Sequence, residues 1–164
     1  MKNIFASLVY LLAFLEATAQ TIVTIEAEGN QYQVIDLTKS GTITWGGNEE
    51  IGLPTGEGNG KLNTLAITKS VGNNSGFDGR TYAAKECENL VAENFDDWYL
   101  PAKAEANLIF LNAEKFDFEE RITLWTSTEA SGTQAVSLYM YTGAYYNVQK
   151  VDSYNYVCVR KVKD

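Results

Sequence analysis

Residues 96–105 read Asp-Asp-Trp-Tyr-Leu-Pro-Ala-Lys-Ala-Glu, a stretch in which extended chain gives way to a helix. Proline suits the first turn of a helix and disfavours helix in the residue before it. The sequence therefore predicts a helix over residues 103–114. Its inward side is predicted to carry Ala104, Leu108 and Leu111, with Ile109 and Phe110 widening the apolar stripe.

The segment before this stretch predicts a second helix, and the segment after it predicts strands. Thr81 is a plausible N-cap for a helix over residues 82–93, whose apolar face carries Ala83, Cys87, Leu90 and Val91. Further on the apolar pattern changes to a period of two. This alternation predicts four strands, over residues 122–126, 135–141, 145–151 and 156–162.

Residues 41–79 hold ten of the 13 glycines, which predicts turns and long loops. Two short strands are expected there, at Thr42–Trp45 and Leu65–Ile67. An edge strand is expected at residues 21–27. Two helices, a run of strands and an early strand paired with the chain end together predict the α+β class.

The N-terminal 19 residues have the layout of a secretory signal. Lys2 supplies a positive charge, residues 4–15 are almost wholly apolar, and Ala17 and Ala19 stand where a signal peptidase reads small residues. A membrane span is the alternative, but it needs about 20 apolar residues. We expect a cleaved signal (1–19), a lead-in with an N-terminal strand (20–40) and one domain (41–164), in a secreted or cell-surface protein.

Export makes a disulfide between Cys87 and Cys158 possible, because an oxidising compartment favours it and the chain has no other cysteine. Two unrelated buried thiols are the alternative. Such a cross-link would make the C-terminal segment an integrated strand rather than a tail.

Composition removes several classes of function. The chain has 164 residues, with 21 acidic and 13 basic side chains, hence a net charge of −8. This balance argues against a nucleic-acid partner, which needs a basic surface. With no histidine and two cysteines, Ser-His catalysis, imidazole-based zinc sites and four-thiolate metal sites are excluded. No cofactor and no metal site are expected.

Three segments resemble the signature of the Lcl C-terminal domain family. They are residues 96–105, residues 124–129 (Leu-Trp-Thr-Ser-Thr-Glu) and residues 157–160 (Val-Cys-Val-Arg). Trp45-Gly46-Gly47 and Leu62-Asn63-Thr64 are similar to its glycine-rich entry loops, so that the resemblance covers residues 42–162. Ala102, Ala106 and Tyr156 depart from the family pattern, and Ala102 removes the usual capping hydroxyl at a cost of about 1 kcal/mol.

The resemblance implies a C-type-lectin-like fold, in which two helices flank a small twisted antiparallel sheet with long irregular loops. A disulfide from the first helix to the last strand is typical of that fold and supports the pairing of Cys87 with Cys158. Lectins, adhesins, retroelement-diversified ligand-binding proteins and formylglycine-generating enzymes share the fold, so the fold alone does not fix the function.

Several motif residues have both a structural and a functional interpretation. Trp45, Trp98 and Trp125 are expected in the core, with sugar stacking as the alternative. Glu105 and Glu129 are expected to hydrogen-bond a loop or helix end, with a ligand or acid/base role as the alternative. The tripeptides of calcium-dependent lectins are absent. A structural calcium could still use loop oxygens, including those of Asp36, Asp96 and Asp97.

Six of the ten tyrosines fall between residues 139 and 156, interleaved with amides and serine. This composition is typical of recognition surfaces, although tyrosine is also a good strand residue. The predicted ligand-binding residues are Tyr139, Tyr141, Tyr145, Tyr146, Asn147, Asp152, Tyr154 and Asn155.

The sequence thus predicts a secreted or surface-displayed binding module without catalysis, recognising an extracellular protein or glycan. One alternative is a structural subunit of an extracellular fibre or envelope assembly. A remote one is a formylglycine-generating type of enzyme, which needs a reactive cysteine or a copper-binding pair near the C-terminus. The sequence leaves the oligomeric state open.

Overall fold

A computed structural model describes residues 21–27, 29–53, 57–73, 79–119 and 121–162. The predicted signal sequence (1–19) lies outside these residues. Among the helices that are described, none combines the length and the apolar character that crossing a bilayer requires.

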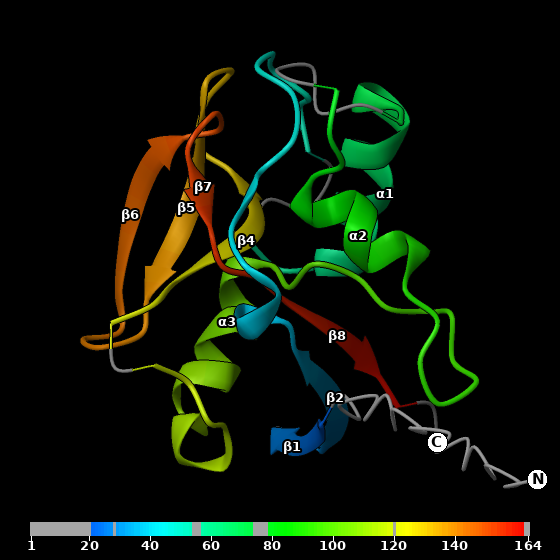
Figure 1. Cartoon of the computed structure of the whole chain (residues 1–164), viewed down its shortest axis with the longest axis vertical. Coiled ribbons are helices and arrows are strands. Elements are labelled where there is room, and N and C mark those ends of the chain that lie inside the picture. The colour runs from blue at the N-terminus through cyan, green and yellow to red at the C-terminus, as the bar shows by residue number, and fades with distance from the viewer. Residues whose placement is uncertain (1–20, 28, 54–56, 74–78, 120, 163–164) are drawn as a thin grey trace, which may run out of the picture.

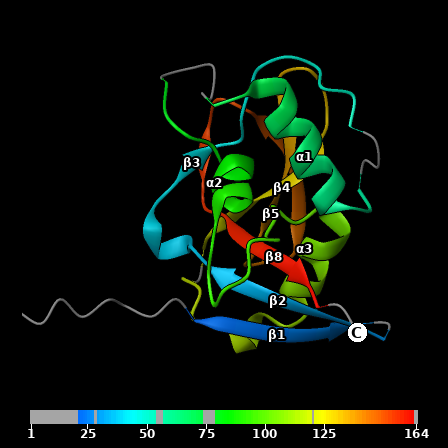
Figure 2. The ribbon, with the colours of Figure 1, turned by 90° about the vertical axis from the view of Figure 1, so that its right-hand side faces the viewer.

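The described chain is an α+β structure, as the sequence predicts, with three helices and three small antiparallel sheets. Figure 2 shows one sheet beneath the first two helices, and Figure 1 shows another at the opposite side of the molecule. The helices are α1 (Gly60–Val71), α2 (Ala83–Asn89) and α3 (Lys103–Phe110). The sheets are β1 (Ile22–Ala27), β2 (Asn30–Asp36) and β8 (Val157–Lys161); β3 (Ile43–Thr44) and β7 (Ser153–Tyr154); and β4 (Thr123–Glu129), β5 (Gln134–Tyr139) and β6 (Ala144–Gln149).

Strands β1 and β2 form an antiparallel hairpin, whereas the sequence predicted a single strand followed by irregular chain over residues 20–40. Its turn contains Gly29 at φ +76°, a left-handed conformation that glycine adopts without steric cost. β1 is an edge strand, as predicted, but the early strand that pairs with the chain end is β2, and Ile35 lies opposite Cys158. The sequence prediction therefore missed β2.

The glycine-rich region holds a helix where a strand at Leu65–Ile67 was predicted, and that prediction is wrong. Asn59 caps α1, because its side chain accepts a hydrogen bond from the Leu62 N–H at 3.0 Å. Gly72 follows the helix, with its N–H donating to the Thr68 carbonyl. Three residues of apparent alternation are too short to outweigh these two end signals, and the structure has three helices instead of the predicted two.

Helix α2 is shorter than the predicted 82–93. It follows Tyr82, whose side chain makes no capping hydrogen bond, and Thr81 does not cap it. The backbone turns extended at Leu90, so that Val91 is 70% exposed instead of lying on the apolar face. Cys87 is fully buried, as expected from its position on that face.

Helix α3 starts at Lys103 as predicted but ends at Phe110, and a separate 3-10 turn covers Ala113–Lys115. Its buried residues are Ala106 and Ile109, and Leu108 and Phe110 pack against the core. The predicted inward face is therefore correct for Leu108, Ile109 and Phe110 but wrong for Ala104 and Leu111, which are exposed. The orientation follows from Glu105, whose carboxylate is hydrogen-bonded to the N-terminus of α1 and to the residue before α3.

The four predicted C-terminal strands exist as β4, β5, β6 and β8, each with ends shifted by a few residues. The two-residue strand β7 lies between the last two and pairs with β3. β5 lies in the middle of its sheet, and Figure 1 shows β6 at the outer edge of the molecule.

The disulfide between Cys87 and Cys158 is present, with 5.3 Å between the two Cα atoms. It joins α2 to β8 inside the larger of two core clusters. The three tryptophans are core residues, as predicted: Trp45 and Trp125 are fully buried and Trp98 is 3% exposed. Each indole N–H donates to a backbone carbonyl, which binds strands and loops together.

Candidate functional site

The tyrosines of β5 and β6 are divided between the two faces of their sheet. Tyr146 lies opposite Ser137 and Tyr145 lies opposite Leu138, so the neighbouring rings point to opposite sides. Leu138 belongs to the core cluster under α3. The predicted ligand-binding tyrosines are therefore not one continuous surface.

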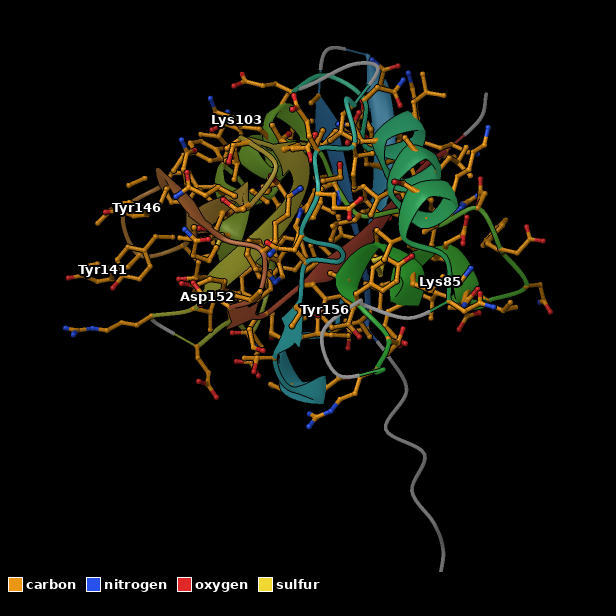
Figure 3. The ribbon with its side chains drawn as sticks, turned by 90° about the horizontal axis from the view of Figure 1, so that it is seen from above. Lys85, Lys103, Tyr141, Tyr146, Asp152 and Tyr156 are labelled. Carbon is orange, nitrogen blue, oxygen red and sulfur yellow. A yellow bond between two sulfur atoms is a disulfide. The ribbon has the colours of Figure 1, made fainter. Side chains whose placement is uncertain are left out.

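Tyr139 and Tyr146 lie on the face of the sheet opposite to Tyr145, and Tyr141 follows β5 close to Tyr139. We call Tyr139, Tyr141 and Tyr146 the tyrosine surface. Tyr141 and Tyr146 are 54% and 52% exposed, and the Tyr139 and Tyr141 ring centroids are 6.1 Å apart. The Arg121 guanidinium lies 5.6 Å from the Tyr141 ring centroid. Figure 3 shows Tyr141 and Tyr146 projecting from the same side of the molecule, away from Lys85. This surface offers flat rings and one cation to a partner.

Tyr145 is held against α3. Its hydroxyl donates to the Lys103 carbonyl at 3.0 Å, and the Lys103 Nζ atom lies 5.2 Å from its ring centroid. Burial raises the pKa of the Tyr145 hydroxyl, and the nearby Glu57 carboxylate adds to the shift. This side chain orients α3 on the sheet.

The remaining predicted residues differ in exposure. The Tyr154 ring packs edge-on against Trp125, with 4.9 Å between ring centroids. Asn155 bridges segments, because its side-chain amide donates to the Thr38 carbonyl and its backbone bonds β4. Asn147 and Asp152 are exposed. Tyr154 and Asn155 therefore have structural contacts, whereas Asn147 and Asp152 face solvent.

A polar cleft lies between the β1–β2 hairpin, the start of α1 and the start of α3, and sequence reasoning missed it. It consists of two cavities of about 510 and 500 Å³ that share Asn30, Tyr32, Gly58 and Glu105 in their linings. An ion pair between Lys103 and Glu57, with 2.7 Å between charged atoms, lies at the second cavity. No sequence signal marks the cleft, because its walls come from six separate segments of the chain.

Glu105 borders this cleft and is committed to backbone groups, in agreement with the predicted helix-end role. Its carboxylate accepts hydrogen bonds from the Ala102 N–H at 2.8 Å, the Gly60 N–H at 2.9 Å and the Tyr99 hydroxyl at 2.9 Å. Burial raises the pKa of the Glu105 carboxyl above its usual value, although these hydrogen bonds oppose the shift. With Ala102 at the N-cap, α3 keeps only the glutamate half of a capping box.

Glu129 holds the glycine-rich loop, as the loop-bonding prediction expected. Its carboxylate accepts hydrogen bonds from the Ile51 and Gly52 N–H groups at 3.0 Å each. The fully buried Lys150 donates to the same carboxylate at 2.5 Å and lies 4.6 Å from the Trp45 ring centroid. No sequence pattern marked Lys150 as buried, because a lysine at a strand end is normally solvated.

The acidic residues considered for calcium do not form a ligand set. The Asp36 carboxylate accepts from the Thr38 N–H and hydroxyl, and Asp97 pairs with Arg160 at 2.6 Å. In the part of the chain that the structure describes, no three acidic or cysteine side chains come together as a metal site.

Two comparisons with known proteins were negative: no protein-family model matches the sequence, and no curated protein matches it significantly.

Proposed function

We propose that the protein is a secreted or surface-displayed recognition module that binds an extracellular protein or glycan without catalysis. The observation that carries the proposal is the tyrosine surface. Tyr141 and Tyr146 leave about half of each side chain exposed on one side of a sheet whose other face is packed against α3.

The chemistry of this surface suits recognition. A tyrosine ring offers a large contact area with only two rotatable side-chain bonds, so it loses little entropy when a partner binds. The strands behind it are fixed by the core, and rigid elements hold contact residues more accurately than loops. The stretch from Tyr139 to Gln149 contains no charged side chain, so a partner need not neutralise any there.

The described architecture is compatible with the C-type-lectin-like fold and the family resemblance, which we retain as part of the proposal. In support, β8 pairs with β2, the disulfide ties α2 to β8, and residues 45–53 after β3 form neither helix nor strand. The disulfide is also what an exported protein would use, which supports the proposed secretion.

Three contacts favour binding over catalysis. Both cysteines of the chain are joined to each other, so neither offers a thiol for a formylglycine-type reaction. Glu105 and Glu129, the two motif carboxylates, each accept hydrogen bonds from backbone N–H groups. A carboxylate held in this way is positioned for structure rather than for proton transfer.

The test is a protein and glycan array probed with the chain from Gln20 onward. We expect at least one ligand whose affinity falls tenfold or more in the double variant Tyr141→Ala/Tyr146→Ala, which corresponds to the loss of two hot-spot side chains. The matched control is Leu111→Ala, because Leu111 is an apolar residue that is 64% exposed, somewhat more than the two tyrosines, and lies past the end of α3. Equal binding by the double variant and the control would reject this surface as the binding site.

A further inference from the structure

The outer edge of β6 is a second surface with a definite chemistry. β6 is the last strand in the order β4-β5-β6, and no other described strand pairs with it. Figure 1 shows it at the margin of the molecule. An unpaired edge exposes backbone donors and acceptors, and proteins usually protect such edges with charges, prolines or bulges.

The ladder shows which backbone groups of β6 face outward. The Met140 N–H donates to the carbonyl of Ile122, the residue before β4, and the Lys150 N–H donates to the carbonyl of Thr133, the residue before β5. Along antiparallel strands, every second residue directs its backbone N–H and C=O toward the same neighbouring strand. Each of these two bonds therefore shows, independently, which residues of β5 and β6 bond each other. The even-numbered residues of β6 bond β5, and Tyr145, Asn147 and Gln149 direct their backbone groups outward.

The edge also lacks protective charge. The chain has a net charge of −8, yet residues 139–149 contain no acidic or basic side chain and no proline. Of the other strands that end the three-stranded sheets, β4 bonds Asn155 through the Trp125 N–H and β8 bonds Tyr99 through Val159. β1 carries Glu26 on an exposed position. Two copies of an acidic protein repel each other least where their contact is neutral. Of these edges, that of β6 is therefore the best suited to self-association.

We propose that two copies of this chain pair through β6 in an antiparallel arrangement, with Asn147 opposite Asn147 of the second copy. In this register each Asn147 N–H bonds the other Asn147 carbonyl, and each Gln149 N–H bonds the Tyr145 carbonyl of the other chain. A register shifted by one residue would place the side chains of the second copy on the opposite face of the sheet, whereas this register keeps equivalent side chains of both copies on the same face. The product is a continuous six-stranded sheet with a two-fold axis.

The same register avoids like-charge contact. Asp152, the first acidic residue after β6, would lie opposite Thr142 of the second copy, whereas Tyr146 would lie opposite Val148. Residue Tyr146 is 52% exposed and gains an apolar neighbour in this way. A second copy of the strand offers a reciprocal set of donors and acceptors and, like the first, carries no charge over residues 139–149, which is why we assign the edge to the chain itself.

This inference does not rest on the proposed ligand-binding role, but it extends it. In the pair, the tyrosine surfaces of both copies lie on the same face of one sheet, so a repetitive ligand could contact both. The contact is small, and we expect a dissociation constant of about 10 µM to 1 mM.

The test is sedimentation equilibrium of the mature chain at concentrations up to about 1 mM, comparing wild type with Asn147→Pro and Asn147→Ala. Proline removes one outward N–H and is tolerated on edge strands, because the bonds to β5 do not use that group. We expect the average mass of wild type and Asn147→Ala to rise with concentration above the monomer mass and toward twice that mass. Asn147→Pro should stay monomeric with a melting temperature near that of wild type.

A second variant keeps the result decisive if the proline variant is unstable. Asn147→Lys places two like charges opposite each other, so it should weaken the dimer tenfold or more at low salt and less at high salt. A wild-type chain that stays monomeric throughout would overturn the proposal. A dimer that survives both the proline and the lysine variant would overturn it as well. Ligand binding in the array assay, which depends on Tyr141 and Tyr146, is read independently of these outcomes.

Discussion

The ammonium group of Lys150 lies 2.5 Å from Oε1 of Glu129, and both side chains are almost completely removed from solvent. The pair joins the end of β6 to the end of β4. Glu129 also accepts hydrogen bonds from Ile51 and Gly52, and Lys150 donates to the Glu49 carbonyl at 2.8 Å. A region whose composition indicates loops is thus fixed to the sheet that carries the tyrosine surface.

We expect Lys150→Met to lower the free energy of unfolding by about 3–5 kcal/mol, because it leaves the buried Glu129 without its counter-charge. Urea denaturation at pH 7 measures the change. The matched control is Lys103→Met, since the Lys103–Glu57 pair is 32% and 61% exposed and should contribute about 0–1 kcal/mol. Equal losses in both variants would show that the buried pair has no special role.

The disulfide is expected to leave no reactive thiol in the mature folded protein. A thiol reagent added under denaturing, non-reducing conditions should therefore detect none. Because Cys87 and Cys158 are 71 residues apart, replacing both with alanine should lower stability by roughly 4 kcal/mol by the chain-entropy estimate. Detection of two thiols per chain would contradict the pairing.

Gly46 is expected to tolerate no side chain. Its φ is +118°, and a Cβ atom there would overlap the ring of Tyr82. Gly41→Ala is the matched control, because Gly41 has a φ of +106° with nothing within 4 Å of the added atom. We expect Gly46→Ala to cost at least about 2 kcal/mol more than Gly41→Ala, since backbone strain is common to both variants and the overlap is not. Thermal denaturation compares them.

The Asp97–Arg160 pair should make stability depend on pH in the acidic range. Burial alone would raise the pKa of the Asp97 carboxyl, but the hydrogen bond and charge of Arg160 outweigh burial and lower it. A carboxyl with a lowered pKa stabilises the fold above its unfolded value of about 3.9, and this contribution is lost as pH falls through the folded pKa.

Asp97→Asn tests this dependence. We expect a loss of about 2 kcal/mol at pH 7, because Arg160 is largely buried and loses its charged partner. The difference from wild type should shrink as the pH is lowered from 5 to 2.5. Unfolding free energies measured across that range decide the matter, and a difference that stays constant with pH would contradict the assignment.

The tyrosines should separate into stabilising and surface residues. We expect Tyr154→Ala to lower stability by about 2–4 kcal/mol, because its ring packs against Trp125. Tyr145→Ala should have a similar effect through lost packing against α3. Tyr141→Ala and Tyr146→Ala should each cost less than about 1 kcal/mol, in keeping with their exposure. Guanidinium denaturation of the four variants would show whether this division holds.

Local patterns in the sequence were enough for much of the fold. Alternation predicted the four C-terminal strands, Pro101 placed the start of α3, and Cys87 on an apolar face indicated the disulfide. These features depend on neighbouring residues and on backbone sterics, which act over a few residues. The same patterns wrongly predicted a strand at Leu65–Ile67, because these three residues were considered apart from the Asn59 cap that directly precedes α1.

Other features of this protein were decided only by the tertiary structure, because they depend on long-range packing. The sequence by itself determined the class, the core tryptophans and the tyrosine-rich region. It did not determine which face of α3 is buried, that Lys150 is enclosed, or that Tyr145 and Tyr146 point to opposite sides of the sheet. Each of these depends on contacts between residues far apart in the chain. Such contacts form only where packing and hydrogen bonding favour them together, and their free energies cannot be assigned to any local stretch.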